Sequence, residues 1–599
     1  MADWERLVIM PLDRGYNRSA PPSMLEPGFS HKVHNMRFAA KRVETDFGLA
    51  TYGDSVLGAA RLVYRFRKKS GVSEIVLITN ETAYKWNNGE WQLIKGPQST
   101  TVSGQHTSPD TTILVVDDTG FADGDLVGIT MDNGKQHITT VNGTPSANVI
   151  TITDGVPTGR TFENGAMFLE APSFSGSMSN PVSADTFPAG DVMIFTNGKD
   201  NVQYYDGTSI QTVTNLVSAV GGGNCYADIV RVKDNKVILF NMNENGTAYP
   251  QRVRWSATGD YTDWTTTDDA GFEDMYDTED PIRAACRVGG DMAIYRSNSM
   301  YLMQYIGSAS LIYSFNRVLD SDGACSGLSV VPYGNTNIIM GKEGFYAYAG
   351  GVEFATFGDP IWELVFGNDG LFNTSAADAV MGYYMESIKS YIFNLPTGES
   401  DLPNTAVVYN KLSQAWSTRG FGRTILSMTN AQVVLGVSWA EATGDWEDSE
   451  WVATQWDDIS LQAGDELVLA AGISDDPTPP DGGIAGGEFG QVYRYSQDYT
   501  DDDGSDITGE FRTHELFLPE DKIRIDRVAM KAKGSSITLE YSEDEGETWT
   551  SYGTATPGSD YDEVSVWKQL VVERVIFRFT GTEFGLSRIT IYWRPESRY

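Results

Sequence analysis

The sequence predicts an all-β protein: a β-propeller of six or seven blades, with an inserted small β-barrel and a C-terminal β-sandwich. Three observations support this fold class. Short strands of alternating polarity are separated by Asn-Gly, Asp-Gly and similar turn residues. A hairpin pattern recurs at intervals of 45 to 55 residues, near the roughly 40–50 residues of a four-stranded propeller blade. We find no window in which apolar residues recur at helical spacing over three turns.

Residues 1–99 are predicted to hold an N-terminal strand and the first blade. The strand Leu7–Met10 is a candidate to close the propeller ring, which would remove exposed sheet edges. The first hairpin runs from Ile78 to Gly89, where an apolar strand is followed by a polar turn and a strand that contains Tyr84 and Trp86.

Residues 100–172 are predicted to be an inserted small β-barrel or sandwich. The interval from Ile78 to Ile194 is 116 residues, which is too long for one blade, and removal of the insert leaves 43. Inside the insert, strand-like runs from Thr112, Gln136 and Asn148 are separated by Asp-Gly and Asn-Gly turns.

The remaining blades are predicted over residues 173–500. Two further hairpins extend from Ile194 to Gly207 and from Ile339 to Gly350. Less regular copies have apolar strands at Val237–Phe240, Met292–Tyr295, Tyr391–Phe393 and Leu467–Leu469. The Pro- and Gly-rich stretch Asp475–Gly487 is predicted to be a long irregular loop.

Residues 501–599 are predicted to form the C-terminal β-sandwich, with strands that alternate apolar and polar residues and end at Ile589–Trp593. This segment contains an Asp-box, S-x-D-x-G-x-T-W, formed by Ser542, Asp544, Gly546, Thr548 and Trp549. We expect a structural role for it: the carboxylate accepts backbone N–H groups in the turn, Gly permits a positive φ, and Trp covers the adjoining sheet.

The net charge and the cysteine content limit the functions that this chain can have. A net charge of −37 disfavours a protein that wraps nucleic acid, since such binding needs Lys and Arg against phosphates. The same charge would suit the inner surface of a channel through which DNA passes without binding. It would equally serve to keep the protein soluble. The three cysteines are far apart in sequence and predict no disulfide framework. This cysteine usage leads us to expect synthesis in a reducing cytoplasm. The sequence also shows no signal for secretion or membrane insertion.

We expect no enzymatic activity, no cofactor and no metal. The five histidines have no metal-ligand spacing, and no nucleotide-binding or nucleophile-elbow motif occurs. Asp260, Asp263, Asp268 and Asp269 are interpreted as a solvated blade turn near Trp255 and Trp264. The acidic loop Asp501–Asp506 could hold calcium through alternating oxygens, although it lacks the EF-hand spacing.

Several segments resemble one family of proteins. They are Asn35-Met36-Arg37-Phe38 with Phe47-Gly48, then Arg252 to Trp264, then Gly327 to Val331 with Gly344 to Gly351. These segments are similar to the tail nozzle, or tail tubular, propeller proteins of short-tailed bacteriophages. The resemblance implies a virion protein that forms a ring of six copies, docks neck or adaptor proteins and tail fibres, and surrounds DNA during ejection without binding it specifically. It also allows contact with the host envelope.

Two other functions remain open. A tail protein that binds a host glycan would use surface aromatic side chains, and the candidates are Trp446, Trp451 and Trp456. The alternative role of these three residues is to pack between adjacent blades. A sialidase-like glycoside hydrolase would need two carboxylates across a cleft, and with 81 acidic residues no pair can be nominated from sequence.

Overall fold

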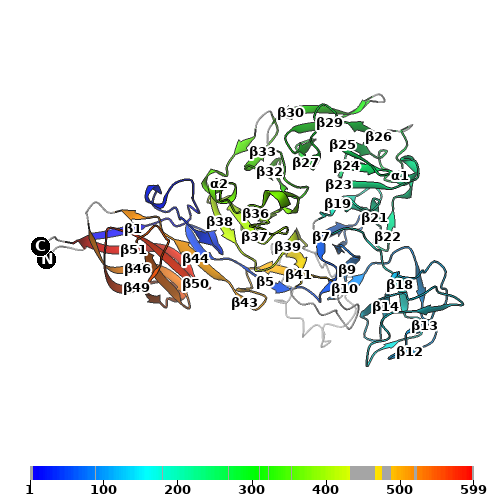
Figure 1. The fold of residues 1–599 in the computed structure, drawn as a ribbon, viewed down its shortest axis with the longest axis horizontal. Helices are drawn as coiled ribbons and strands as arrows, with labels where there is room; N and C mark the ends of the chain where they lie inside the picture. The colour runs from blue at the N-terminus through cyan, green and yellow to red at the C-terminus, as the bar shows by residue number, and fades with distance from the viewer. Residues whose placement is uncertain are drawn as a thin grey trace, which may run out of the picture. The chain divides into compact units, whose positions relative to one another are not determined.

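The computed structural model describes residues 5–87, 89–177, 180–266, 269–308, 311–320, 323–351, 354–431, 466–474, 488–517 and 522–596 (Figure 1). Among the residues that the structure describes, strands account for 55% and helices for 4%. The predicted all-β class is therefore confirmed. Among the described residues, no helix is long and apolar enough to span a membrane.

The chain divides into two compact units. The first unit comprises Met1–Ala50, Asp280–Leu426 and Tyr495–Tyr599, and the second comprises Thr51–Glu279 and Ser427–Arg494. Both units consist mainly of antiparallel sheets.

Three four-stranded sheets of the second unit have the consecutive strand order of propeller blades. Their strands are β7 (Ala60–Arg67), β8 (Ser73–Thr79), β9 (Ala83–Asn87) and β10 (Glu90–Leu93), then β19 (Ser183–Phe187), β20 (Val192–Thr196), β21 (Gln203–Tyr205) and β22 (Ile210–Thr212), then β23 (Cys225–Lys233), β24 (Lys236–Glu244), β25 (Thr247–Trp255) and β26 (Gly271–Asp274). Asp234 and Asn235 both have positive φ between β23 and β24, as a two-residue type I′ hairpin requires.

The second unit also holds β6 (Val56–Leu57), β40 (Val468–Ile473), the short helix α1 (Thr214–Ala219), and most of β39 (Ile425–Asn430) and β41 (Phe489–Ser496). Strand β40 lies between β39 and β41, and β6 pairs with β41. Apolar residues of β19, β20, β23 and β24 alternate into one buried cluster, so the pattern of period two places them in the core.

The inserted passage has its own hydrophobic core, which includes Val102, Ile113, Ile129, Ile150 and Phe168. Its strands are β11 (Ser99–Thr101), β12 (His106–Thr107), β13 (Thr112–Leu114), β14 (Leu126–Thr130), β15 (Gln136–Thr140), β16 (Val149–Thr151), β17 (Thr161–Phe162) and β18 (Met167–Glu170). The largest sheet of the insert has the order β11-β18-β14-β15, so its first and last strands are neighbours. This pairing brings the start and the end of the inserted passage together.

Three more blade-like sheets belong to the first unit. Their strands are β27 (Ile282–Val288), β28 (Asp291–Arg296), β29 (Met300–Ser308) and β30 (Leu311–Leu319), then β31 (Val330–Tyr333), β32 (Thr336–Met340), β33 (Phe345–Tyr348) and β34 (Ala355–Thr356), then β35 (Met381–Met385), β36 (Ser390–Leu395), β37 (Thr405–Asn410) and β38 (Ala415–Arg419). Helix α2 (Asp359–Val365) and two 3-10 helices, η1 (Pro22–Met24) and η2 (Thr374–Ala379), complete the helical content of the described residues. The consecutive order is that of propeller blades, and closure into a ring stays a prediction.

The hairpin β29–β30 extends past its own sheet. Strand β28 pairs with β29 between Met300 and Met303, whereas β29 and β30 stay paired out to Ser308 and Leu311. The outer part is therefore a two-stranded ribbon. It carries Tyr305, Ile306 and Leu311, each about half exposed.

The C-terminal sandwich is built from both ends of the chain. One sheet continues from β38 through β2 (Val33–His34) to β44 (Thr508–Arg512), β50 (Arg574–Thr582), β47 (Ile537–Ser542) and β48 (Thr550–Ala555), with β45 (Leu516–Phe517) paired to β50. The other contains β1 (Glu5–Ile9), β3 (Met36–Ala39), β4 (Arg42–Thr45), β51 (Gly585–Pro595), β46 (Ile523–Gly534) and β49 (Gly558–Val572). In Figure 1, the strands β1, β51, β46 and β49 lie side by side.

The prediction that Leu7–Met10 closes the propeller ring is wrong. Strand β1 pairs instead with β51, in the register Ile9 opposite Ile589 and Leu7 opposite Ile591. Ile9 is buried and Leu7 packs against the same core, so their alternation fits the sandwich. Two smaller elements of this unit are β5 (Gly48–Thr51), which ends at the unit boundary, and the hairpin β42 (Asp501–Asp502) with β43 (Ser505–Asp506).

Candidate functional site

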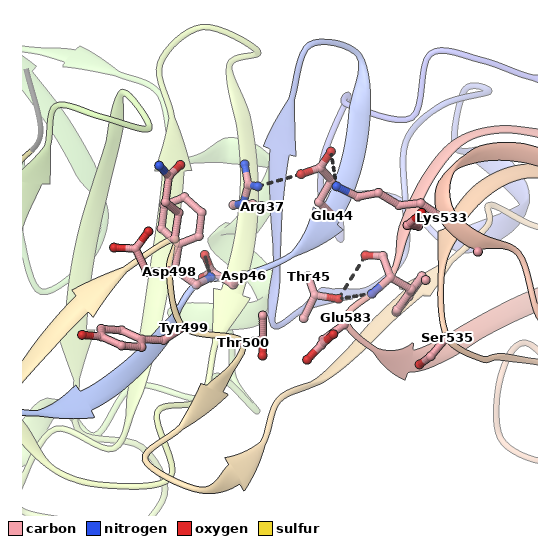
Figure 2. Close-up of a pocket in the computed structure, with 16 residues that line it drawn as sticks. Arg37, Glu44, Thr45, Asp46, Asp498, Tyr499, Thr500, Lys533, Ser535 and Glu583 are labelled. Atoms are coloured by element: carbon pink, nitrogen blue, oxygen red, sulfur yellow. Dashed lines mark hydrogen bonds and ion pairs between the residues drawn. The ribbon is translucent and has the colours of Figure 1, made fainter. Parts of the chain in front are cut away.

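A cavity of about 770 Å³ opens in the first unit beside the hairpin β3–β4. Its other walls come from residues 497–500, from the end of β46, from the start of β49 and from the turn between β50 and β51. Figure 2 shows Arg37, Glu44, Asp46, Asp498 and Lys533 around this space. The strand pairings of the sandwich therefore bring together segments that are far apart in the sequence.

Glu44 is a carboxylate of the cavity wall that contacts three polar side chains. It accepts hydrogen bonds from Arg37 Nη2 at 2.6 Å and from the Tyr561 hydroxyl at 2.8 Å, and Lys533 Nζ lies 3.3 Å away. Burial raises the pKa of Glu44, but the Arg37 charge and the bonds from Tyr561 and Lys533 outweigh burial and lower it. Glu44 is therefore held ionised, which suits charge pairing and not proton donation.

Arg37 links the cavity to the aromatic core. Its guanidinium lies 4.5 Å from the centre of the Phe47 ring, a cation–π arrangement. Its Nε is buried and has no hydrogen-bond partner among the described residues. The remaining wall is rich in hydrogen-bonding groups, with Gln497, Asp498, Tyr499, Thr500, Ser535, Ser559 and Glu583. Such a lining fits a polar, hydroxyl-rich ligand.

A buried ion-pair network lies behind Asp46. Arg419 is 1% exposed and donates from Nη2 to both carboxylate oxygens of Asp502, at 2.7 and 2.8 Å. Its Nε lies 3.6 Å from Asp46, which also accepts from the Tyr495 hydroxyl at 3.0 Å. Burial lowers the pKa of Arg419, but the charges of Asp46 and Asp502 outweigh it and raise the pKa. This network is a structural anchor of the unit.

A second cavity, of about 420 Å³, lies between the segment Arg18–Pro21, His31 and helix α2. Trp362 of α2 is 44% exposed, and its Nε1 donates to the Glu343 carbonyl at 2.8 Å. Asp359 and Glu363 are one helical turn apart on the same face of α2, and both line the cavity. Burial is the main cause that lowers the pKa of His31 to about 4, and the charges of Arg18 and Arg512 lower it further. The imidazole of His31 is therefore neutral at pH 7.

The Asp-box residues form a tight turn after β47. Asp544 accepts from the Ser542 hydroxyl at 2.6 Å and from the Thr548 amide at 2.9 Å, and Gly546 has φ +96°. The hydroxyls of Ser542 and Thr548, with the Thr548 amide, lower the pKa of Asp544 to about 2. The Trp549 ring lies under the guanidinium groups of Arg512 and Arg578, at 4.8 and 4.3 Å. These contacts fasten the turn to the neighbouring strands β44 and β50.

The other sequence candidates have different outcomes. Trp446, Trp451 and Trp456 lie outside the described residues. In the acidic loop Asp501–Asp506, the carboxylate of Asp502 is occupied by Arg419, and the described residues contain no group of three acidic, His or Cys side chains able to hold a metal ion. Asp269 is not simply solvated, because it pairs with the fully buried Lys236 at 2.8 Å. Trp255 and Trp264 are buried.

Sequence reasoning missed both cavities. The larger cavity is formed by strands from distant parts of the sequence that pair with one another, and no short sequence motif indicates it. The second depends on α2, which is too short to show helical periodicity. The Gly358-Asp359-Pro360 sequence, with Pro in the first helical turn, was the one available indication of a helix start.

No family model and no curated protein matches this chain. Among solved structures, it is similar to an exo-β-1,3-galactanase of Phanerochaete chrysosporium with galactose, at 8% identity and a TM-score of 0.23, over 69% of this chain and 95% of that one. A variant of that enzyme with β-1,3-galactotriose matches over 86% and 99%, at 11% identity and a TM-score of 0.21. PorZ of the Porphyromonas gingivalis type-IX secretion system matches over 62% and 39%, at 10% identity and a TM-score of 0.25.

These matches correct one expectation. Because glycoside hydrolases are among the matched structures, the prediction that this chain has no enzymatic activity is contradicted, and we withdraw it. The TM-scores are too low for the matches to supply an activity in its place.

Proposed function

We propose that this chain is a structural component of a bacteriophage tail, a nozzle or hub protein of the virion. In this role it forms a ring of copies, docks neck or adaptor proteins and tail fibres, and lets DNA pass through the ring during ejection. The resemblance of the segments around Asn35, Arg252 and Gly344 to tail nozzle proteins supports the proposal. So does the strongly acidic charge of −37, which would keep DNA from binding the wall.

The projecting hairpin β29–β30 is the observation that carries the proposal. A two-stranded ribbon is marginally stable by itself in water, yet this one holds Tyr305, Ile306 and Leu311 about half exposed beyond the edge of its sheet. Exposed apolar side chains of this kind are typical of protein–protein contacts. The hairpin is therefore suited to insert into a neighbouring subunit or a docked tail protein.

The test is the mass and shape of the purified protein. Multi-angle light scattering, alone and with tails purified from a phage that carries this protein, followed by electron microscopy, should show rings with a central opening located at the tail. A chain that stays at 65.8 kDa under both conditions, with no binding to tails, would contradict the proposal. Replacement of Ile306 and Leu311 by Ser should weaken docking without unfolding the blade, because both side chains are largely outside its core.

A second candidate function is recognition of a host glycan, and the cavity beside Trp362 favours it. An exposed indole next to carboxylates, an arginine and a neutral imidazole offers an apolar ring face together with polar hydrogen-bonding groups. Asp359 and Glu363 both line this cavity, and glycoside hydrolysis uses two carboxylates.

Binding and turnover of a saccharide should be measured together. A glycan array and a titration with β-1,3-galactotriose test binding, and release of reducing sugar tests hydrolysis. Binding that is lost in Trp362→Ala would support the glycan role. Turnover that is lost in Glu363→Gln while binding persists would show a hydrolase, and neither binding nor turnover would leave the tail-assembly proposal as the function to pursue.

A further inference from the structure

The outward face of the sheet β1-β51-β46-β49 is basic, although the chain as a whole is strongly acidic. Antiparallel pairing places Arg6, Tyr592, Arg527 and Trp567 in one row across the four strands. Alternate residues such as Val528 and Ile591 are buried in the sandwich core. The row therefore points to solvent on the opposite face of the sheet.

Within the row, Arg527 lies between two aromatic rings. The guanidinium of Arg527 lies 3.7 Å from the centre of the Tyr592 ring and 4.8 Å from that of Trp567. Trp567 is nevertheless 65% exposed. Large exposed aromatic and arginine side chains are the residue types enriched at the centres of protein interfaces.

Neighbouring rows add further positive charge. Lys531 is paired in register with Arg588, and Arg524 with Arg594. Glu563 neutralises Arg588 at 2.8 Å, and Glu596 lies 4.0 Å from Arg524. Arg6, Arg527 and Lys531 form no ion pair with any carboxylate that the structure describes. In a chain with 81 Asp and Glu residues against 44 Lys and Arg residues, three cations on one sheet face are thus left without a paired carboxylate among the described residues.

The inserted domain has the opposite character. Residues 100–172 contain nine Asp and Glu against one Lys and one Arg. The domain also exposes an apolar patch: Val116 is 62% exposed, and Leu114 and Met167 are about half exposed. The Val116 amide bonds to the Thr101 carbonyl, and Thr101 is opposite Met167, so the patch spans adjacent strands. Asp117 and Asp118 follow Val116 directly.

We propose that the basic sheet face of one copy docks the acidic inserted domain of a second copy of this chain. The charges are complementary, and each surface has an exposed apolar centre, Trp567 on one and Val116 on the other. The two surfaces differ, so the contact is heterologous and closes a ring if the rotation per copy permits. This inference rests on the proposed function, because it specifies how the copies of the ring associate.

Two charge variants test the contact. Arg527→Glu with Lys531→Glu makes the sheet face acidic, and Leu114→Lys with Val116→Lys makes the insert patch basic. Each variant alone should weaken self-association by at least about tenfold, because like charges then meet across the contact. Lys41→Glu with Lys199→Glu, at cations outside the four-strand face, changes the net charge as much as the face variant does, and this control should assemble like the wild type.

Mixing the two variants in equal amounts is the decisive experiment. In the mixture, an acidic face meets a basic insert at one contact and a basic face meets an acidic insert at the next, so assembly should return with the two variants in a one-to-one ratio. Native mass spectrometry measures that ratio. Circular dichroism of each variant alone checks that its fold is kept.

The possible outcomes distinguish a failure of this docking contact from a failure of the proposed tail-assembly function. If the wild type forms rings and the face variant does so equally well, the inference is overturned while the tail-assembly proposal stands. If the wild type never associates with itself or with tails, the proposed function itself fails. If the face variant assembles normally but loses binding to purified tails or to a fluorescent single-stranded oligonucleotide, the face serves a different partner and the second-copy occupant is wrong.

Discussion

The buried Arg419 network allows a sharp test of how the first unit is stabilised. Replacement of Arg419 by Met keeps much of the side-chain volume and removes the charge. Asp502 then loses two hydrogen bonds and Asp46 loses its nearest cation, and both carboxylates are almost fully buried. Breaking a buried ion pair in this way costs about 3–5 kcal/mol, because an uncompensated charge stays in a poorly solvated place.

We therefore expect Arg419→Met to lower the free energy of unfolding of this unit by about 3–5 kcal/mol. Urea denaturation followed by tryptophan fluorescence measures the change. Arg14→Met is the matched control, because its ion pair with Glu26 at 2.6 Å is largely exposed, and such pairs contribute at most about 1 kcal/mol. Addition of Asp502→Asn to Arg419→Met should recover stability. A loss below about 1 kcal/mol for Arg419→Met would refute the reasoning.

Three further predictions concern other parts of the first unit. Gly546→Ala should destabilise the Asp-box turn by about 1–2 kcal/mol in urea denaturation, because φ there is +96° and a Cβ would meet Trp549 at 3.3 Å; no change would show that the turn relaxes. Burial lowers the pKa of His34 and of His514 from 6.5 to about 4. As the pH decreases, these histidines are therefore protonated in the unfolded chain before they are protonated in the folded one, and the free energy of unfolding should fall between pH 6.5 and pH 4. The slope of this fall should be smaller in His514→Gln. If the Trp362 cavity binds a saccharide, Trp362→Ala should weaken the affinity about tenfold in calorimetry, whereas Trp567→Ala should leave it unchanged.

The hairpins were predictable from local chemistry. The segments Ile78–Gly89, Ile194–Gly207 and Ile339–Gly350 all contain paired strands, because polar turn residues and flanking apolar strands specify a hairpin without distant partners. The strands of the C-terminal segment follow in the same way from period-two alternation, as β46 and β51 show.

Long-range partners were not predictable by this route. Leu7 and Ile9 have an alternation that would suit any apolar sheet, so the sequence alone could not choose between a propeller blade and β51. The same limit hid the larger cavity, in which Tyr561 donates to Glu44 across 517 positions of the chain. Pairing of distant strands decides such a site, and single-sequence patterns carry no information about that pairing.

The pairing of β1 with β51 also has a consequence for biosynthesis. Ile9 leaves the ribosome long before its partner Ile589, which is 580 residues later in the sequence. At roughly 5–20 residues per second, the N-terminal strand waits on the order of 30–120 s for that partner. Its apolar side chains need protection by chaperones or by early collapse during this time. A chain that stops before β51 cannot form this pairing and leaves β1 without its partner strand.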